Sequence, residues 1–178
     1  MSKTYWLSSP ETSDLFERLV LEIFDFLITD YGFAVMKTEK DGHGARITLG
    51  SNAAAIQLNY EPGGLRIWVL LYRLLKGHLP EYPLTVIPGE KSDLFYIQDI
   101  MVAKEPRIRG SDLYVSIGQL GMFTPITEEY LREKLQTIAD CVRQYAQDVL
   151  AGNFTIFEEA QKVRDARVSQ YLSQNENR

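Results

Sequence analysis

Two histidines and one cysteine are the residues of this sequence most suited to proton transfer, metal binding or nucleophilic attack. His43 stands between two glycines in a predicted turn, and His78 lies in a proline-rich loop. Either side chain could titrate near neutral pH, yet a catalytic base also needs an orienting partner, and the sequence places none beside them. Cys141 falls beside the apolar stripe of a predicted helix, where a small thiol is ordinary packing. We therefore expect no catalytic residue among them.

The glycines and carboxylates predict no cofactor or metal site either. Gly42 and Gly44 lack the third glycine and the following helix of a dinucleotide-binding turn, and no lysine of a phosphate-binding loop follows Gly118 or Gly121. The acidic residues between positions 25 and 41 are spread over different predicted elements, so they predict neither a carboxylate pair nor a magnesium site. One cysteine and two histidines are too few for structural zinc. The sequence thus predicts no metal, no cofactor and no enzyme.

Four charged residues stand within apolar arcs of predicted helices. Glu17 and Asp30 belong to the first helix, and Arg164 and Arg167 belong to the last. Because burial of an unpaired charge is costly, we expect these groups to pair, with Arg164 and Glu17 as the specific pair if the two helices touch. The alternative is that both arginines stay exposed and bind an anionic ligand or partner.

Four aromatic residues form the second candidate group, namely Tyr60, Trp68, Tyr72 and Tyr82. Such side chains supply contact energy with little loss of entropy, so they could line a ligand pocket or a protein-binding face. Packing in the core is the alternative. An uncovered sheet face around Trp68 and Tyr72 would indicate a partner.

The elements that position these residues begin with a helix over about 10–31. Ser9 and Pro10 are typical of an N-cap and a first helical position, and Gly32 is typical of the residue after a helix end. Apolar residues occupy roughly two thirds of the helix circumference. We therefore expect this helix to be covered on two sides, by a sheet and by other helices.

From Phe33 to Leu75 the apolar period is two, which predicts strands. The turns at 40–44, 51–52 and 62–64 are short, which favours an antiparallel meander. The strand at 65–75 is apolar on both faces, so we expect it to be covered twice or to line a cavity. Segment 76–125 is broken by proline and glycine; it contains a predicted short strand and helical turn at 94–103 and a weak strand at 113–117.

Two more helices are predicted near the C-terminus. Thr127 opens one that ends at Gly152, and a capping box of Thr155 with Glu158 opens another that runs to about 172. Residues 174–178 are expected to form a flexible tail. The predicted fold is α+β, with an N-terminal helix, an antiparallel β-meander of about four to five strands, and two C-terminal helices packed with the first helix. Residues 1–178 are expected to form a single domain.

The composition narrows the class of protein. The 178 residues are 45% hydrophobic and 24% charged, which is typical of a folded chain. The net charge of −5 is spread in mixed signs, so the basic surface that nucleic-acid binding requires is absent from the sequence. No apolar run has the length of a signal peptide or a membrane span. We expect a cytoplasmic protein that binds neither nucleic acid nor membrane.

Short motifs give the sequence a resemblance to known proteins. They are Asp30-Tyr31-Gly32-Phe33 after the first helix, Tyr60-Glu61-Pro62 in the meander, and Ala151-Gly152-Asn153-Phe154 after the run 145–150. With this layout the chain resembles a loose group of uncharacterised bacterial proteins, some of which are similar to the immunity proteins that neutralise polymorphic toxins. No functional residue carries over, because the motifs hold no group that does chemistry. The resemblance implies a small cytosolic protein that works by binding.

These observations lead to three expectations for function. The first is non-catalytic binding of another protein, with a toxin-antidote role as its sharper form, since an acidic antidote would attract a basic toxin. The second is binding or turnover of a small molecule in a pocket between strand 65–75 and segment 76–125, lined by Trp68 and Tyr72. The third is a structural subunit that forms a homodimer through an exposed apolar sheet face.

Overall fold

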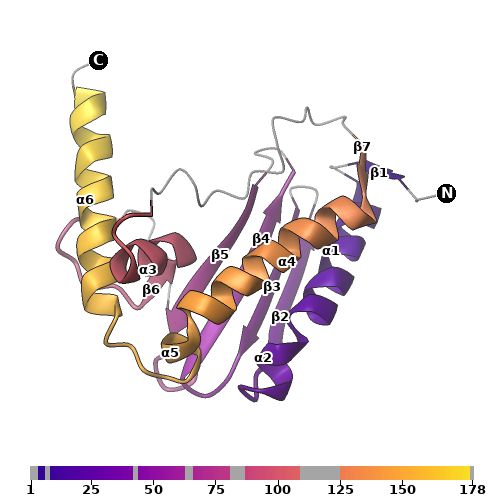
Figure 1. Cartoon of the computed structure of the whole chain (residues 1–178), viewed down its shortest axis with the longest axis horizontal. Helices are drawn as coiled ribbons and strands as arrows, with labels where there is room; N and C mark the ends of the chain where they lie inside the picture. The colour runs from indigo at the N-terminus through magenta and orange to yellow at the C-terminus, as the bar shows by residue number, and fades with distance from the viewer. Residues whose placement is uncertain are drawn as a thin grey trace.

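The structure is a computed structural model that describes residues 4–6, 9–41, 44–62, 66–80, 87–108 and 125–176. Over these residues the chain has an α+β fold, in which helices cover one face of a five-stranded antiparallel sheet (Figure 1). The predicted fold class is therefore confirmed.

The first helix begins where the sequence predicts. Ser9 is the N-cap of α1 (Pro10–Ile23), and its Oγ accepts a hydrogen bond from the backbone N–H of Thr12 at 3.3 Å. A turn at Phe24 separates α1 from the short helix α2 (Asp25–Thr29). Gly32 then adopts a φ of 66°, a left-handed conformation that favours glycine after a helix end. The predicted helix over 10–31 is thus two helices in close succession.

The meander that follows has the predicted topology. Its strands are paired in chain order and every pair is antiparallel; they are β2 (Ala34–Asp41), β3 (Gly44–Gly50), β4 (Ala54–Glu61), β5 (Arg66–Arg73) and β6 (Leu94–Tyr96). Short turns force this arrangement for β2 to β5, because they return the chain directly beside the strand it has left. The fifth strand, β6, with helix α3 (Ile97–Lys104) after it, corresponds to the short strand and helical turn predicted at 94–103.

The two faces of the sheet bury different residues. Alternate strand residues face the helices and form the main core with them; these are Ala45, Ile47, Leu49, Ala54, Ile56, Leu58, Tyr60, Ile67, Val69 and Leu71. The opposite face carries a second, smaller cluster that contains Ala55, Leu70, Tyr72, Leu74 and Leu94. Strand β5 contributes buried residues to both clusters, which agrees with the prediction that this strand is covered twice or lines a cavity.

The helices of the C-terminal half divide between two places. Helix α4 (Glu128–Tyr145), capped by Thr127, lies beside α1 on the same sheet face and is followed by the short α5 (Gln147–Leu150). Helix α6 (Phe157–Glu176) packs chiefly against α3 (Ile97–Lys104) and β6 (Figure 1). The prediction that both helices pack with the first one holds for α4 only, because β6 and α3 place α6 at the sheet edge remote from β2.

The remaining differences lie at element ends. A small antiparallel sheet of β1 (Thr4–Trp6) and β7 (Pro125–Thr127) was not predicted. Helix α6 continues to Glu176, so residues 174–176 of the predicted tail are helical. The weak strand predicted at 113–117 lies outside the described residues.

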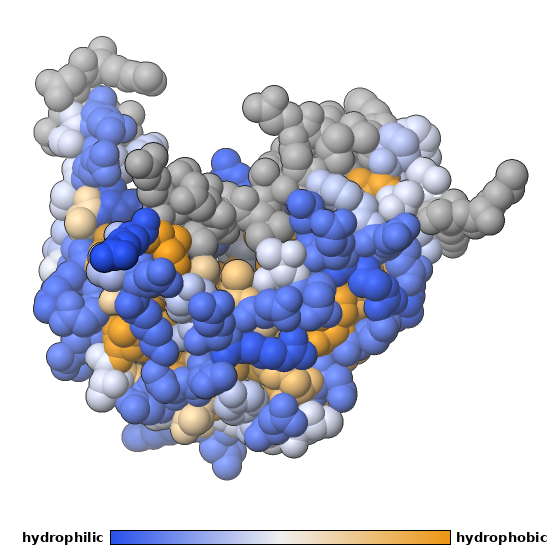
Figure 2. Space-filling view, in the orientation of Figure 1, coloured by the Kyte–Doolittle hydropathy of each residue, from blue (hydrophilic) through white to orange (hydrophobic). Residues whose placement is uncertain are grey.

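The outer surface of the helical layer is largely hydrophilic, as Figure 2 shows in the orientation of Figure 1. Salt bridges link α1 and α4 there, since Arg18 contacts Glu128 at 2.7 Å and Arg132 contacts Glu22 at 2.5 Å. Among the described helices, none combines the length and the apolar character needed to cross a membrane.

Candidate functional site

The candidate site lies on the sheet face opposite α1 and α4, where strand register aligns side chains in rows. Arg46 of β3 pairs with Asn59 of β4, which in turn pairs with Trp68 of β5. At the next pair on the same face, two residues along each strand, Gln57 of β4 lies opposite Leu70 of β5. Directly opposite residues have neighbouring side chains on one face. The face is therefore polar over β3 and β4 and aromatic or apolar over β5 and β6.

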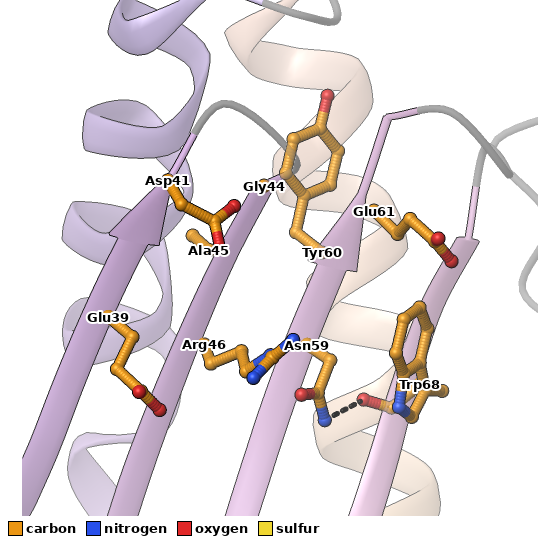
Figure 3. Close-up of a pocket in the computed structure, with 9 residues that line it drawn as sticks. All are labelled: Glu39, Asp41, Gly44, Ala45, Arg46, Asn59, Tyr60, Glu61 and Trp68. Carbon is orange, nitrogen blue, oxygen red and sulfur yellow. Dashed lines mark hydrogen bonds between the residues drawn. The ribbon is translucent and has the colours of Figure 1, made fainter.

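Hydrogen bonds fix the two amide side chains of this face. Tyr72 donates its phenolic O–H to Oε1 of Gln57 at 3.1 Å, and Nε2 of Gln57 donates to Oγ1 of Thr48 at 3.2 Å. Nδ2 of Asn59 donates to the backbone carbonyl of Trp68 at 3.4 Å (Figure 3). The amide groups are thus held in one orientation, as a binding site requires.

These rows form the floor of an open pocket of about 410 Å³. Its described lining residues are Arg46, Gln57, Asn59, Trp68, Leu70, Tyr72, Leu79, Pro80 and Tyr96. A volume of this order lies within the range of small-molecule sites, and an apolar lining with a few fixed polar groups is typical of them. A smaller hollow of about 70 Å³ adjoins it and shares Arg46, Asn59 and Trp68 (Figure 3).

Arg46 is the charged residue at the centre of this arrangement. Glu39 of β2 lies directly opposite it in the sheet register, a position that favours an ion pair. Glu39 instead contacts Nζ of Lys37 at 2.8 Å, and Figure 3 shows the side chain of Arg46 extending away from Glu39. Within the described part of the chain, the guanidinium of Arg46 has no ion pair, and its side chain extends toward Asn59.

The predicted aromatic group is divided by the sheet. Trp68 and Tyr72 lie in the pocket, as the small-molecule alternative expected. Tyr60 faces the helices instead, where its ring stacks on Phe16 at 5.3 Å and burial raises the pKa of its hydroxyl. The reason is register, since Tyr60 pairs with Ile67 whereas Trp68 pairs with Asn59. Tyr82 lies outside the described residues.

The predicted pairing of helix charges is wrong. Glu17 contacts Lys40 of β2, at 2.5 Å, and Asp30 is exposed and accepts a hydrogen bond from Thr29. Arg164 instead donates to the carbonyl of Glu90 at 2.7 Å and contacts Asp165. The physical reason is the position of α6 beside α3, which keeps Arg164 away from Glu17.

Arg167 does find a buried acidic partner, although a different one from those predicted. Its Nη2 donates to Oδ2 of Asp99 at 3.2 Å, while Nη1 lies 2.7 Å from Oδ1 without the alignment of a hydrogen bond. Burial raises the pKa of Asp99, and the nearby guanidinium of Arg167 opposes this. The guanidinium also lies over the ring of Tyr96, 5.5 Å from its centroid. Because Tyr96 lines the pocket, this contact connects α6 to the candidate site.

The residues first considered for chemistry stay outside the pocket. His78 is exposed and bridges to Leu75 through its backbone, and His43 lies outside the described residues. Cys141 is half-buried on α4, and burial, with a smaller contribution from Asp140, raises the pKa of its thiol. In the described ranges of the chain, no cluster of three or more metal-ligating side chains is present.

Sequence reasoning missed Arg46, Gln57 and Asn59 as site residues. The signal was present in the strand alternation, because Arg46 alternates with Ile47, and Gln57 and Asn59 alternate with apolar neighbours of β4. Such a pattern usually marks a solvated face. These polar residues line a pocket only because the neighbouring strand β5 places aromatic residues beside them on the same face.

Comparison with known proteins gives no functional assignment for this site. No protein-family model, no curated protein and no solved structure matches the chain.

Proposed function

We propose that this protein works by binding, and that its ligand is a small molecule held in the pocket on the sheet face opposite α1 and α4. The observation that supports this proposal is the pocket itself, in which Trp68 and Tyr72 face the fixed amides of Gln57 and Asn59. The described lining residues of this pocket include no histidine, cysteine or carboxylate that could transfer a proton or attack a substrate. Binding without turnover is therefore the simplest use of this chemistry.

Capture from the native cell lysate tests the proposal. The tagged protein is recovered at low and moderate salt, and mass spectrometry identifies bound small molecules and proteins. We expect the wild-type chain to retain a small molecule that Trp68→Ala releases. Trp6→Ala is the matched control, because Trp6 is 56% exposed in β1 and lines neither pocket. A folded Trp68→Ala protein that retains the same molecule in equal amount would refute the pocket as its site.

Protein binding is the second candidate, and the end of α6 favours it. Tyr171 and Leu172 are 67% and 48% exposed on the part of α6 that projects beyond α3 (Figure 1). Exposed aromatic and aliphatic side chains on a helix are typical anchors for a partner. Neutralising a toxin is the form of protein binding that the resemblance to immunity proteins implies. In the same capture, a stoichiometric protein lost from Tyr171→Ser but kept by Trp68→Ala would favour this candidate.

The homodimer alternative gains no support from the described residues of the sheet face opposite α1 and α4. Leu70 and Tyr72 are buried, Trp68 is half-buried, and β3 and β4 contribute polar side chains there. The described residues therefore form a hollow with mixed chemistry and not an extensive apolar surface.

A further inference from the structure

The distribution of charge around the pocket indicates the class of ligand. Arg46 lies where the two hollows meet, at the polar end of the row that continues through Asn59 to Trp68. On this row the hydrogen-bond donors Arg46 and Asn59 belong to β3 and β4, and the aromatic side chain of Trp68 belongs to β5. A ligand that contacts both the donors and the aromatic surface must be amphipathic.

We propose that the pocket binds a small organic anion, with its carboxylate or similar group at Arg46 and its planar apolar body against Trp68, Tyr72 and Tyr96. This inference rests on the proposed function and specifies its ligand. A guanidinium donates paired hydrogen bonds to a carboxylate, and flat rings pack on aromatic side chains. Lysine at this position would supply charge without the paired geometry.

The state of Arg46 supports an anion over a neutral ligand. Its cross-strand neighbour Glu39 is engaged by Lys37, and the side chain of Arg46 extends toward Asn59 and not toward that carboxylate. Among the described residues, Arg46 accordingly keeps its charge-assisted hydrogen bonds available for a ligand. A neutral polar ligand would accept weaker hydrogen bonds from this guanidinium than an anion would, so we expect it to bind less tightly.

The position of the other carboxylates decides on which side of Arg46 the anion lies. Glu39, Asp41 and Glu61 line the smaller hollow, where they would repel a negative group. The larger pocket has no carboxylate among its described lining residues and contains the aromatic walls. The anion therefore binds on the side of Arg46 that faces Gln57 and Asn59, with the apolar body directed toward β5 and β6.

Matched pairs of ligands test the charge directly. The probes are benzoate, phenylacetate, indole-3-acetate and 2-naphthoate, each compared with its own carboxamide, which has the same shape without the charge. Binding is measured by calorimetry, and for non-indole probes also by the fluorescence of Trp68 in a Trp6→Phe background, because the chain has 2 tryptophans. We expect at least one carboxylate to bind about tenfold or more tightly than its amide, since a charge-assisted hydrogen bond has that magnitude.

Variants locate the effect at the proposed residue. Arg46→Gln should abolish the preference for the carboxylate, and Arg46→Lys should restore part of it. Arg66→Gln is the matched control, because Arg66 is exposed at the start of β5 and lines neither hollow, so it should keep the wild-type preference. Arg46 is exposed, so its replacement should leave the thermal unfolding temperature unchanged.

The outcomes separate this inference from the proposed function. Equal binding of carboxylate and amide, with quenching of Trp68 fluorescence by both, would overturn the anion and leave the pocket as the binding site. If Arg46→Gln keeps the wild-type preference for the carboxylate, the anion at Arg46 is likewise overturned and the pocket remains the binding site. If no probe binds and the captured protein retains no small molecule that Trp68→Ala releases, the anion and the proposed pocket function both fail.

Discussion

Arg167 on α6 holds the buried carboxylate of Asp99 on α3, and this ion pair joins the last helix to the body of the protein. The side chain of Asp99 is 1% exposed, whereas that of Arg167 is 41% exposed. Burial raises the pKa of Asp99, and Arg167 opposes that rise through charge and hydrogen bonding. Removing the guanidinium would therefore leave an ionised carboxylate buried with less compensation.

Arg167→Gln should destabilise the protein most at neutral pH. We expect a loss of about 2 kcal/mol at pH 7, below the values for fully buried pairs because Arg167 is partly solvated. The unfolded-state pKa of an aspartate is roughly 3.9, and the folded-state pKa of Asp99 lies above it. The loss of folding free energy caused by the buried charge therefore grows as the pH rises through the folded-state pKa. It disappears at low pH, where Asp99 is protonated. Urea unfolding at pH 7 and pH 4 measures the difference.

Two further variants check the origin of this effect. Asp99→Asn in the Arg167→Gln background removes the buried charge and should recover most of the lost stability at pH 7. Lys162→Gln, which breaks an exposed ion pair with Glu159 on the same helix, should leave the unfolding curve unchanged. A loss in Arg167→Gln that is equal at both pH values would show that the charge of Asp99 is not its cause.

The N-cap of α4 provides a local test of the fold. Oγ1 of Thr127 accepts a hydrogen bond from the backbone N–H of Tyr130 at 3.2 Å. Thr127→Ala should lower the free energy of unfolding by about 1 kcal/mol, which is typical for the loss of a capping oxygen. Thr137→Ala in the middle of α4 is the control, because its hydroxyl only donates to the carbonyl of Glu133 at an exposed position. If both threonines gave the same loss in urea unfolding, the cap would not be the cause.

Local signals of this kind explain why much of the fold could be predicted from the sequence. Ser9, Gly32 and Thr127 act on the backbone within a few residues of themselves, so their effect is visible in the sequence alone. The alternation of period two likewise identifies strands, and short turns make neighbours of consecutive ones.

The candidate site depends on relationships that are not local. Arg46, Asn59 and Trp68 become neighbours only through the register of three strands, and a shift of one residue would move each to the other face. The failed pairing of Arg164 with Glu17 has a similar origin. It required the packing position of α6, which follows from the course of β6 and α3, and periodicity of the helices does not determine that position.

The thiol of Cys141 should react slowly in the folded protein. Burial raises its pKa, and the neighbouring Asp140 adds to the effect, so the thiolate fraction at pH 8 is smaller than for a free cysteine. We expect iodoacetamide to alkylate the folded protein more slowly than the same chain in urea, as followed by intact mass. Alkylation at the rate of free cysteine in the folded state would contradict the described packing of α4.

Gly44, the first residue of β3, carries the most demanding backbone constraint in the described part of the sheet. Its φ is 135°, and a Cβ added there would lie 1.8 Å from the backbone carbonyl oxygen of Tyr60 on β4. Since that oxygen belongs to the paired strand, the clash cannot be relieved by a side-chain rotation. Gly44→Ala should therefore cost roughly 3 kcal/mol or more, at the upper end of overpacking penalties.

Gly77→Ala is the control that separates steric overlap from backbone preference. Gly77 also has a positive φ, of 80°, but an added Cβ would meet nothing within 4 Å. Its replacement should cost only about 1 kcal/mol, the penalty of a left-handed conformation for a residue with a Cβ. Thermal and urea unfolding of both variants measure the contrast. Equal losses would mean that β3 and β4 do not approach each other at Gly44 as closely as described, and the rows that form the pocket floor would then need a different register.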